Sequence, residues 1–152
     1  MHLNIFASVL IGLHLLYTSY HASRAFASGN QAVGAVPQEE RMADTKAQKI
    51  AHLNDRFRTS QIGHGRLMIT SGINANGPEY VLRVLGLITA FDGFTPDNDP
   101  YGEHDFGSVD VDGQKIFWKF DYYSPDLKSG SPDPTDESKT CRVLTIMYSH
   151  EY

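Results

Sequence analysis

The dipeptide Asp112-Gly113 stands between two segments in which apolar and polar residues alternate. Asp-Gly in this setting is typical of a two-residue type I′ turn, which joins two antiparallel strands. A loop of two residues also fixes the register, so that opposed residues can be counted outward from the turn. The predicted pairs are Val111 with Gln114, Asp110 with Lys115, Val109 with Ile116 and Gly107 with Trp118.

The two faces of this hairpin differ in character. One face carries the opposed charges of Asp110 and Lys115, and the other carries an apolar set. Trp118 lies opposite a glycine, and we expect its ring to cover the gap that Gly107 leaves in its strand. The residues predicted to point inward from the second strand are Ile116, Trp118, Phe120 and Tyr122.

Hydrophobic periodicity predicts the remaining elements. Residues 45–58 carry one apolar stripe of an amphipathic helix, with Asp44 or Thr45 as its N-cap. Residues 66–72 are a short strand candidate, and Pro78 begins a second helix that is apolar over most of its circumference and should be the more deeply buried. Residues 141–148 are apolar on both sides, as in a strand inside a sheet.

The order helix, strand, helix, strand, strand, strand predicts an α+β fold. We expect a mostly antiparallel four-stranded sheet with both helices on one face. A chain of 152 residues that is 41% hydrophobic and 20% charged is long enough for one folded domain, placed at residues 42–152.

Residues 1–41 are interpreted as a signal-peptide-like segment or as an upstream extension that does not belong to the protein. The apolar run Ile5 to Tyr17 suits a signal-peptide core better than a membrane anchor, which needs about twenty residues. Ala25-Phe26-Ala27 fits a cleavage site, so residues 1–27 would direct export, but no Lys or Arg precedes the apolar run. A translation start at Met42, directly before the first helix, would instead give a cytoplasmic protein.

Charge argues against nucleic-acid binding. The formal net charge is -5, whereas nonspecific binders of nucleic acids carry a basic surface. Between Asp92 and Glu137 there are twelve acidic residues and three lysines, a formal charge of -9. Such a surface holds cations, mimics a polyanion or is simply solvated.

The single cysteine, Cys141, excludes an internal disulfide framework and a multi-cysteine zinc site. It is a poor candidate for a nucleophile, because a free cysteine in an apolar strand behaves as a small core residue.

Two long polar segments, residues 93–104 and 124–140, are the expected places for function. Four carboxylates and one imidazole gather in or directly after the first, enough for a divalent metal. This candidate metal site consists of Asp97, Asp99, Glu103, His104 and Asp105. It is not an EF-hand, since Tyr101 and Ser108 stand where ligands are required. The alternative is that these residues hydrogen-bond their own backbone in consecutive turns.

The same segment offers a catalytic candidate. His104 would act as a general base, oriented by Glu103 or Asp105. Adjacent residues in an extended chain point to opposite sides, so the partner would be a residue such as Asp121 or Asp97 brought in by folding. The other interpretation of His104 is a structural, hydrogen-bonded histidine.

The second polar segment suggests partner binding. Aromatic anchors beside acidic groups are typical of protein interfaces, and the candidate residues are Tyr101, Tyr122, Tyr123, Asp126 and Asp133. The alternative is an ordered surface loop.

Three motifs carry a resemblance to a known family: FTPDNDPYGEHDFGSVDVDGQKIFWKFDYY, GSPDPTD and RVLTIMYSHEY. They resemble a family of small proteobacterial proteins, frequently plasmid-borne, that is described only as a domain of unknown function. The resemblance covers roughly Leu53 to Tyr152. Members of that family usually begin shortly before a helix like LNDRFR at residues 53–58, which favours the start at Met42. The resemblance implies no activity, cofactor or catalytic residue, and an accessory role in host or plasmid defence is compatible with it.

Two functions therefore follow as expectations. The first is a small accessory or interaction protein whose acidic, two-loop face binds a macromolecular partner, and a basic protein fits the charge. The second is a metal-dependent, hydrolytic enzyme that uses the cluster from Asp97 to Asp105.

Overall fold

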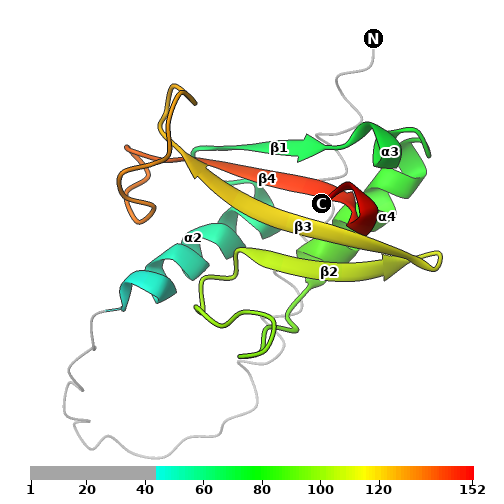
Figure 1. Cartoon of the computed structure of the whole chain (residues 1–152), viewed down its shortest axis with the longest axis horizontal. Coiled ribbons are helices and arrows are strands. Elements are labelled where there is room, and N and C mark those ends of the chain that lie inside the picture. Colours follow the sequence, from blue (N-terminus) through cyan, green and yellow to red (C-terminus); the bar gives the residue numbers. More distant parts are fainter. Residues whose placement is uncertain (1–43) are drawn as a thin grey trace, which may run out of the picture. The chain divides into compact units, whose positions relative to one another are not determined.

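The computed structural model describes residues 44–152, in which two helices lie on one face of a four-stranded sheet (Figure 1). The elements in chain order are α2 (Lys46–Ser60), β1 (Gly65–Ile69), α3 (Ser71–Asn74), α4 (Pro78–Ala90), β2 (Phe106–Val111), β3 (Gln114–Tyr123), β4 (Cys141–Tyr148) and the short 3-10 helix η1 (Ser149–Glu151). The α+β fold is confirmed, and so is the predicted order of the long elements, to which the structure adds the short helices α3 and η1. The proposed signal peptide, the cleavage site and the alternative start at Met42 lie outside the described residues.

The strand order across the sheet is β1-β4-β3-β2. β3 runs antiparallel to both β2 and β4, and β1 is parallel to β4. The sheet is therefore mostly antiparallel, with one parallel pair. β4 lies inside the sheet, as its continuous apolar sequence predicts.

The register of the β2–β3 hairpin is the one counted from the Asp112-Gly113 turn, with all four predicted pairs present. Both turn residues have a positive φ, 51° at Asp112 and 76° at Gly113, as a type I′ turn requires. Gly107 lies under the indole of Trp118, because a Cβ added there would come within 2.5 Å of the ring. The glycine is therefore needed for the tryptophan to lie flat on its neighbouring strand.

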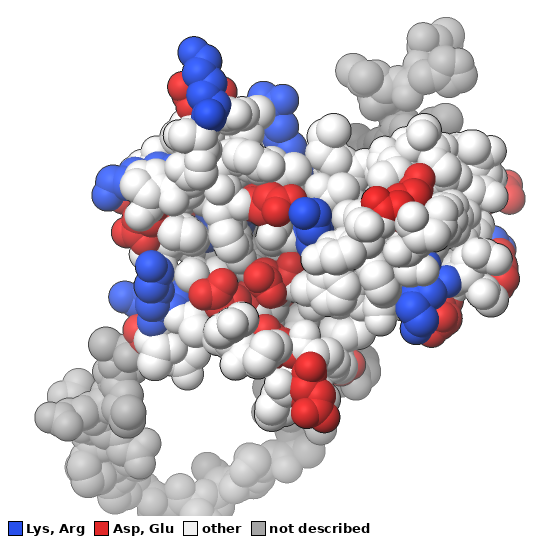
Figure 2. Space-filling model, in the orientation of Figure 1, with Lys and Arg blue, Asp and Glu red and all other residues white. Residues whose placement is uncertain are grey.

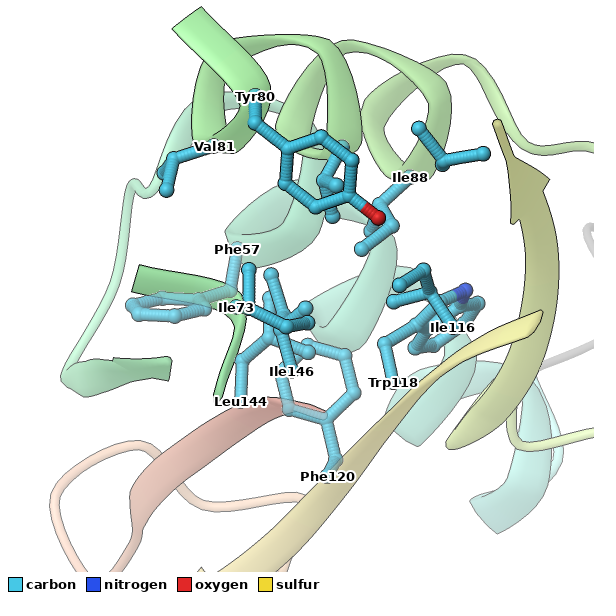
Figure 3. Packing of buried hydrophobic residues seen from close by; sticks show 12 residues of the cluster. Phe57, Ile73, Tyr80, Val81, Ile88, Ile116, Trp118, Phe120, Leu144 and Ile146 are labelled. Carbon is cyan, nitrogen blue, oxygen red and sulfur yellow. The ribbon is translucent and has the colours of Figure 1, made fainter. Parts of the chain in front are cut away.

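The core lies between the sheet and the helices. Ile116 and Trp118 of β3 are fully buried, and Phe120 contacts Phe57 of α2 edge to face at 6.1 Å. Figure 3 shows α4 above these strands, with Val81 and Ile88 on the side of the helix that packs in the same cluster. Alternation along β3 thus produces one buried face, as the sequence predicts.

The ends of α2 and α4 follow their sequences. Thr45 caps α2 with a reciprocal capping box: its hydroxyl accepts from the Gln48 amide at 3.2 Å, and the Gln48 side chain accepts from the Thr45 amide at 2.8 Å. Pro78 occupies the first turn of α4, where its missing amide proton has no cost.

Two predictions about local structure are wrong. The strand candidate at residues 66–72 ends at Ile69, and residues 71–74 form the short helix α3. Gly72 and Asn74 have a low propensity for strands. The Asn74 side chain instead donates to the Ile69 carbonyl at 3.1 Å.

The second wrong prediction concerns α4, which is not the more deeply buried helix. Only one side of it meets the sheet, so Leu82 and Leu87 are 36% and 44% exposed. Four of its 13 residues are buried, against five of the 15 residues of α2, so α4 is not buried more deeply than α2.

Of the helices in residues 44–152, none combines the length and the apolar character that crossing a bilayer requires.

Candidate functional site

The candidate site is organised by one face of α2, which holds the loop that precedes β2. Asp55 uses both carboxylate oxygens: Oδ1 accepts from Arg58 at 2.8 Å and Oδ2 contacts Nδ1 of His104 at 2.7 Å. Arg58 also donates to the carbonyls of Ile88 and Thr89 at the end of α4, where the helix dipole favours a cation. α2 therefore links the C-terminal end of α4 to the loop that leads from α4 to β2.

Three side chains hold the ring of His104 in this arrangement. Its ring stacks on Phe94 with centroids 3.7 Å apart and planes 2° apart. Its Nε2 lies 3.7 Å from Oδ2 of Asp99, so both ring nitrogens face carboxylates. Its φ of 51° is in the left-handed region. This conformation costs a non-glycine residue free energy and is kept only where neighbouring contacts enforce it.

Asp99 closes the turn that carries His104. It is 9% exposed, and its carboxylate accepts from the backbone amides of Glu103 at 3.1 Å and His104 at 3.3 Å. This is the self-bonded turn that the sequence offered as an alternative to a ligand cluster. The orienting residues predicted for His104 were Glu103, Asp105, Asp121 or Asp97, whereas the structure places Asp55 and Asp99 at its ring nitrogens.

This geometry favours the structural interpretation of His104, as a clamp between the loop and α2. Replacing it with asparagine, which tolerates a positive φ, should lower the free energy of unfolding by about 1–2 kcal/mol, because ring stacking and a charge-assisted hydrogen bond are lost. Urea unfolding followed by circular dichroism measures the change. Replacing the exposed His52 of α2 with asparagine is the control and should have little effect. Equal stability of the two variants would show that His104 does not clamp the loop.

The predicted metal ligands are not brought together around one point. Asp99 faces backbone amides, His104 faces Asp55, and Asp97 is exposed. Within residues 44–152, no group of three or more His, Cys, Asp or Glu side chains is arranged to hold a metal ion. The metal-dependent enzyme stays a prediction that this geometry does not favour.

Glu103 and Asp105 differ from the other acids of the loop, because both are half-buried. Burial raises the pKa of the Glu103 carboxyl, and the negative charges of Asp105 and Asp99 raise it further, while Lys46 opposes them. Burial also raises the pKa of Asp105, opposed by a backbone hydrogen bond and reinforced by Asp99 and Asp121. Neither carboxylate has an ion-pair partner among residues 44–152.

Acidic residues of the second loop accept hydrogen bonds from other residues of the same loop. Oδ1 of Asp126 accepts from the Ser124 hydroxyl at 2.6 Å, and Oδ1 of Asp133 accepts from the amide and hydroxyl of Thr135. These hydrogen bonds lower the pKa of both carboxyls. The loop is therefore ordered, and it displays carboxylates that are held in their ionised form.

Buried Asn54 connects the two loops. Its amide donates to the Glu103 carbonyl at 2.9 Å and to the Tyr122 hydroxyl at 2.7 Å, and its Oδ1 accepts from Nε of Arg142 at 3.2 Å. Arg142 in turn donates to the carbonyl of Pro134 in the second loop. Since Lys46 lowers the pKa of both Glu103 and Asp133, carboxylates of both loops also lie within its electrostatic range.

The three candidate tyrosines differ in exposure. Tyr101 is 79% exposed and Tyr123 is 37% exposed, so both are accessible at the surface. Tyr122 points inward to Asn54, and burial raises the pKa of its hydroxyl. Tyr122 thus contributes to the buried hydrogen bonds around Asn54, while Tyr101 and Tyr123 are accessible to a partner.

We define the acidic face as Asp97, Glu103, Asp105 and Asp121 together with Tyr101. Figure 2 shows acidic atoms gathered over the loop before β2 and the adjoining part of the sheet. Asp121 is paired with Lys119 at 3.0 Å, whereas Glu103 and Asp105 have no ion-pair partner among residues 44–152.

The sequence did not reveal the residues of α2 and β4 that hold the two loops in place: Asn54, Asp55, Arg58 and Arg142. The available signals were three polar residues at positions 54, 55 and 58 of an amphipathic helix, and an arginine in a strand that is otherwise apolar. Neither signal identifies the contact partner.

Comparison with known proteins adds a family and no activity. A family model described as "Protein of unknown function (DUF3768)" matches residues 69–151, from the end of β1 through η1. Searches of curated proteins and of solved structures gave no match. The match covers more than half of the chain and includes both loops, which confirms the resemblance to a family of unknown function. The chain therefore belongs to the DUF3768 family of proteins of unknown function.

Proposed function

We propose that this domain is a non-enzymatic interaction module that binds a basic segment of another protein through its acidic face. The observation that supports this proposal is the state of Glu103 and Asp105, two half-buried carboxyls with raised pKa and no ion-pair partner within residues 44–152. A carboxyl with a raised pKa is disfavoured in its charged form by the folded state.

At neutral pH this arrangement costs the folded protein free energy. A lysine or arginine that approaches the two carboxylates would offset that cost, since an opposite charge at close range favours the ionised form. Carboxyls with a strongly shifted pKa are frequent at functional sites, where a protein tolerates a cost in stability. The charge pattern thus favours a cationic partner.

Other residues of the two loops suit the same partner. Tyr101 offers an exposed ring for a cation–π contact beside the acidic residues. In the second loop, Oδ1 of Asp126 and of Asp133 is taken by the loop itself, while their Oδ2 atoms make no hydrogen bond within the described residues. These oxygens are available to donors from outside.

The proposal is tested with a fluorescein-labelled synthetic peptide rich in lysine and arginine, and binding to the full chain is followed by fluorescence anisotropy. The double variant Glu103→Gln with Asp105→Asn should bind about tenfold more weakly or worse, which corresponds to about 1.4 kcal/mol. Binding by the wild type should also weaken when salt rises from about 50 to about 300 mM, because the contacts are ionic.

The matched control also removes two negative charges, but at the other end of β2. Asp110→Asn with Asp112→Asn leaves an Asn-Gly turn, which suits the hairpin equally well. If the control lost as much affinity as the Glu103/Asp105 variant, binding would depend on net charge alone and the proposed face would be wrong. An affinity that does not change with salt would also contradict the proposal.

A further inference from the structure

β2 lies at one edge of the sheet and pairs with another strand on one side only. In the strand order β1-β4-β3-β2, its single neighbour within residues 44–152 is β3, and Figure 1 shows β2 at the margin of the sheet. An edge strand presents a row of backbone N–H and C=O groups that no strand of its own sheet binds. The outer side of β2 is therefore a place where a further strand could pair.

The register of the hairpin shows which backbone groups of β2 are free. In an antiparallel pair, opposed residues alternate between pairs that exchange two hydrogen bonds and pairs that exchange none. The Phe120 amide donates to the Asp105 carbonyl at 2.7 Å, so the odd-numbered residues of β2 bond to β3. Phe106, Ser108 and Asp110 thus direct their amides and carbonyls away from β3. Within residues 44–152, no backbone group of another element hydrogen-bonds to these six groups.

β2 has few of the features that keep an edge strand from pairing. Such features include a proline, a lysine and a bulge. The sequence of β2, FGSVDV, contains neither proline nor lysine, and all six residues pair with β3 in an unbroken register. Its one charged residue, Asp110, is paired with Lys115 at 3.6 Å. The free edge is thus regular enough to form a second ladder of hydrogen bonds.

The charges around this edge select the kind of strand that fits it. Residues 103–112 contain four acidic residues and neither lysine nor arginine. Asp110 and Asp112 have ion-pair partners, whereas Glu103 and Asp105, directly before β2, have none among the described residues. A second copy of this chain fits poorly, because antiparallel pairing of two β2 strands would bring the acidic end of one toward the acidic start of the other. A basic segment instead places its charges beside the two unpaired carboxylates.

We propose that the cationic partner binds as an extended segment and adds to the free edge of β2 as a fifth strand. This inference rests on the proposed function, because the acidic face supplies the preference for a basic partner. The backbone of Phe106 and Ser108 supplies hydrogen bonds, and basic side chains of the segment lie near Glu103 and Asp105. Binding of this kind takes its affinity from main-chain hydrogen bonds and its specificity from alternate side chains.

The face of the sheet opposite the helices offers a contact for those alternate side chains. Successive residues of a strand point to opposite faces, and Phe106 and Ser108 point away from the core. The Phe106 ring lies edge to face against Phe117 at 5.2 Å and against Tyr152 at 5.8 Å. Lys119 Nζ already lies 5.9 Å from the centre of the Tyr152 ring. A lysine or arginine of the added strand, opposite Phe106, would gain a similar cation–π contact.

Amide hydrogen exchange of the full chain, read residue by residue by nuclear magnetic resonance, tests the proposal with and without the lysine- and arginine-rich peptide. In the free protein, Gly107 and Val109 should exchange slowly and Phe106 and Ser108 quickly, because only the first two donate to β3. Saturating peptide should slow exchange at Phe106 and Ser108 by about tenfold or more, as expected for new hydrogen bonds. Peptide that binds without slowing these two amides would overturn the added strand and leave the proposed function standing. Absence of binding would overturn both.

The variant Ser108→Pro tests the edge itself. It removes an outward amide, and an edge strand tolerates proline where the lost N–H faces solvent, so the hydrogen bonds to β3 remain. Peptide binding, followed by fluorescence anisotropy, should weaken about tenfold. The control Ser108→Ala keeps the amide and should bind like the wild type, and the buried indole of Trp118 reports that both variants are folded. Equal affinity of the two folded variants would show that the partner does not pair with β2.

Discussion

Replacing Trp118 with alanine is expected to lower the free energy of unfolding by about 3–5 kcal/mol, the usual range for truncating a buried aromatic residue. Trp118 is fully buried, and its ring contacts Phe91, Phe94 and Phe120 edge to face. Its neighbour across the hairpin is Gly107, whose missing side chain leaves no group to fill the cavity. The loss is a large part of the roughly 5–15 kcal/mol that stabilises an ordinary domain.

Urea unfolding followed by far-ultraviolet circular dichroism measures this effect. The control is Leu87→Ala, which removes an apolar side chain that is 44% exposed on the outer side of α4. We expect it to change the stability by less than about 1 kcal/mol. Similar losses in the two variants would mean that the hairpin does not pack beneath α4. The wild-type protein offers an independent check, because its single tryptophan should fluoresce as a buried indole.

Replacing Asn54 with leucine should destabilise the domain by about 3 kcal/mol or more, although leucine has a similar volume. The change leaves three buried groups without a partner: the Glu103 carbonyl, the Tyr122 hydroxyl and Nε of Arg142. Each unsatisfied group costs about 1–3 kcal/mol, and the losses are not fully additive because the groups share one residue. Since Asn54 connects both loops, amide hydrogen exchange should also accelerate in residues 97–105 and 131–140.

The matched control is His52→Leu, on the exposed side of the same helix. It should alter stability by no more than about 0.5 kcal/mol and leave exchange in both loops unchanged. If Asn54→Leu were as stable as this control, the hydrogen-bonded link between the loops would have no energetic weight.

Local chemistry explains why much of the fold was predictable. The Asp112-Gly113 turn specifies a type and a length, and the register of the hairpin then follows by counting. The capping box at Thr45 and the proline at the start of α4 are likewise signals that act within a few residues. The structure agrees with these predictions because each feature depends only on residues that are close together in the sequence.

The wrong predictions arise where tertiary contacts decide. Apolar residues over most of the circumference of α4 suggested that it is the more deeply buried of the two helices, but the sheet covers only one side and leaves Leu82 and Leu87 exposed. The strand after α2 ends early, since residues 71–74 pack as a short helix whose Gly72 lies close to Glu151.

The candidate site was predictable only in its acidic half. The loop residues 97–105 stand together in the sequence, so their charge was evident. The groups that hold them come from far away: Asp55 is 49 residues from His104, and Asn54 is 88 residues from Arg142. Helical periodicity places Asp55 and Arg58 on one face, but it does not say which loop that face meets.

The central claim is that the acidic face binds cationic segments, and amide nuclear magnetic resonance tests it most directly. The full chain, labelled with nitrogen-15, is titrated with the same lysine- and arginine-rich peptide at low salt. We predict shifts concentrated in residues 97–105 and 121–133, with saturation at one peptide per chain. Shifts centred on the hairpin turn at residues 110–115, or an unchanged spectrum, would contradict the claim.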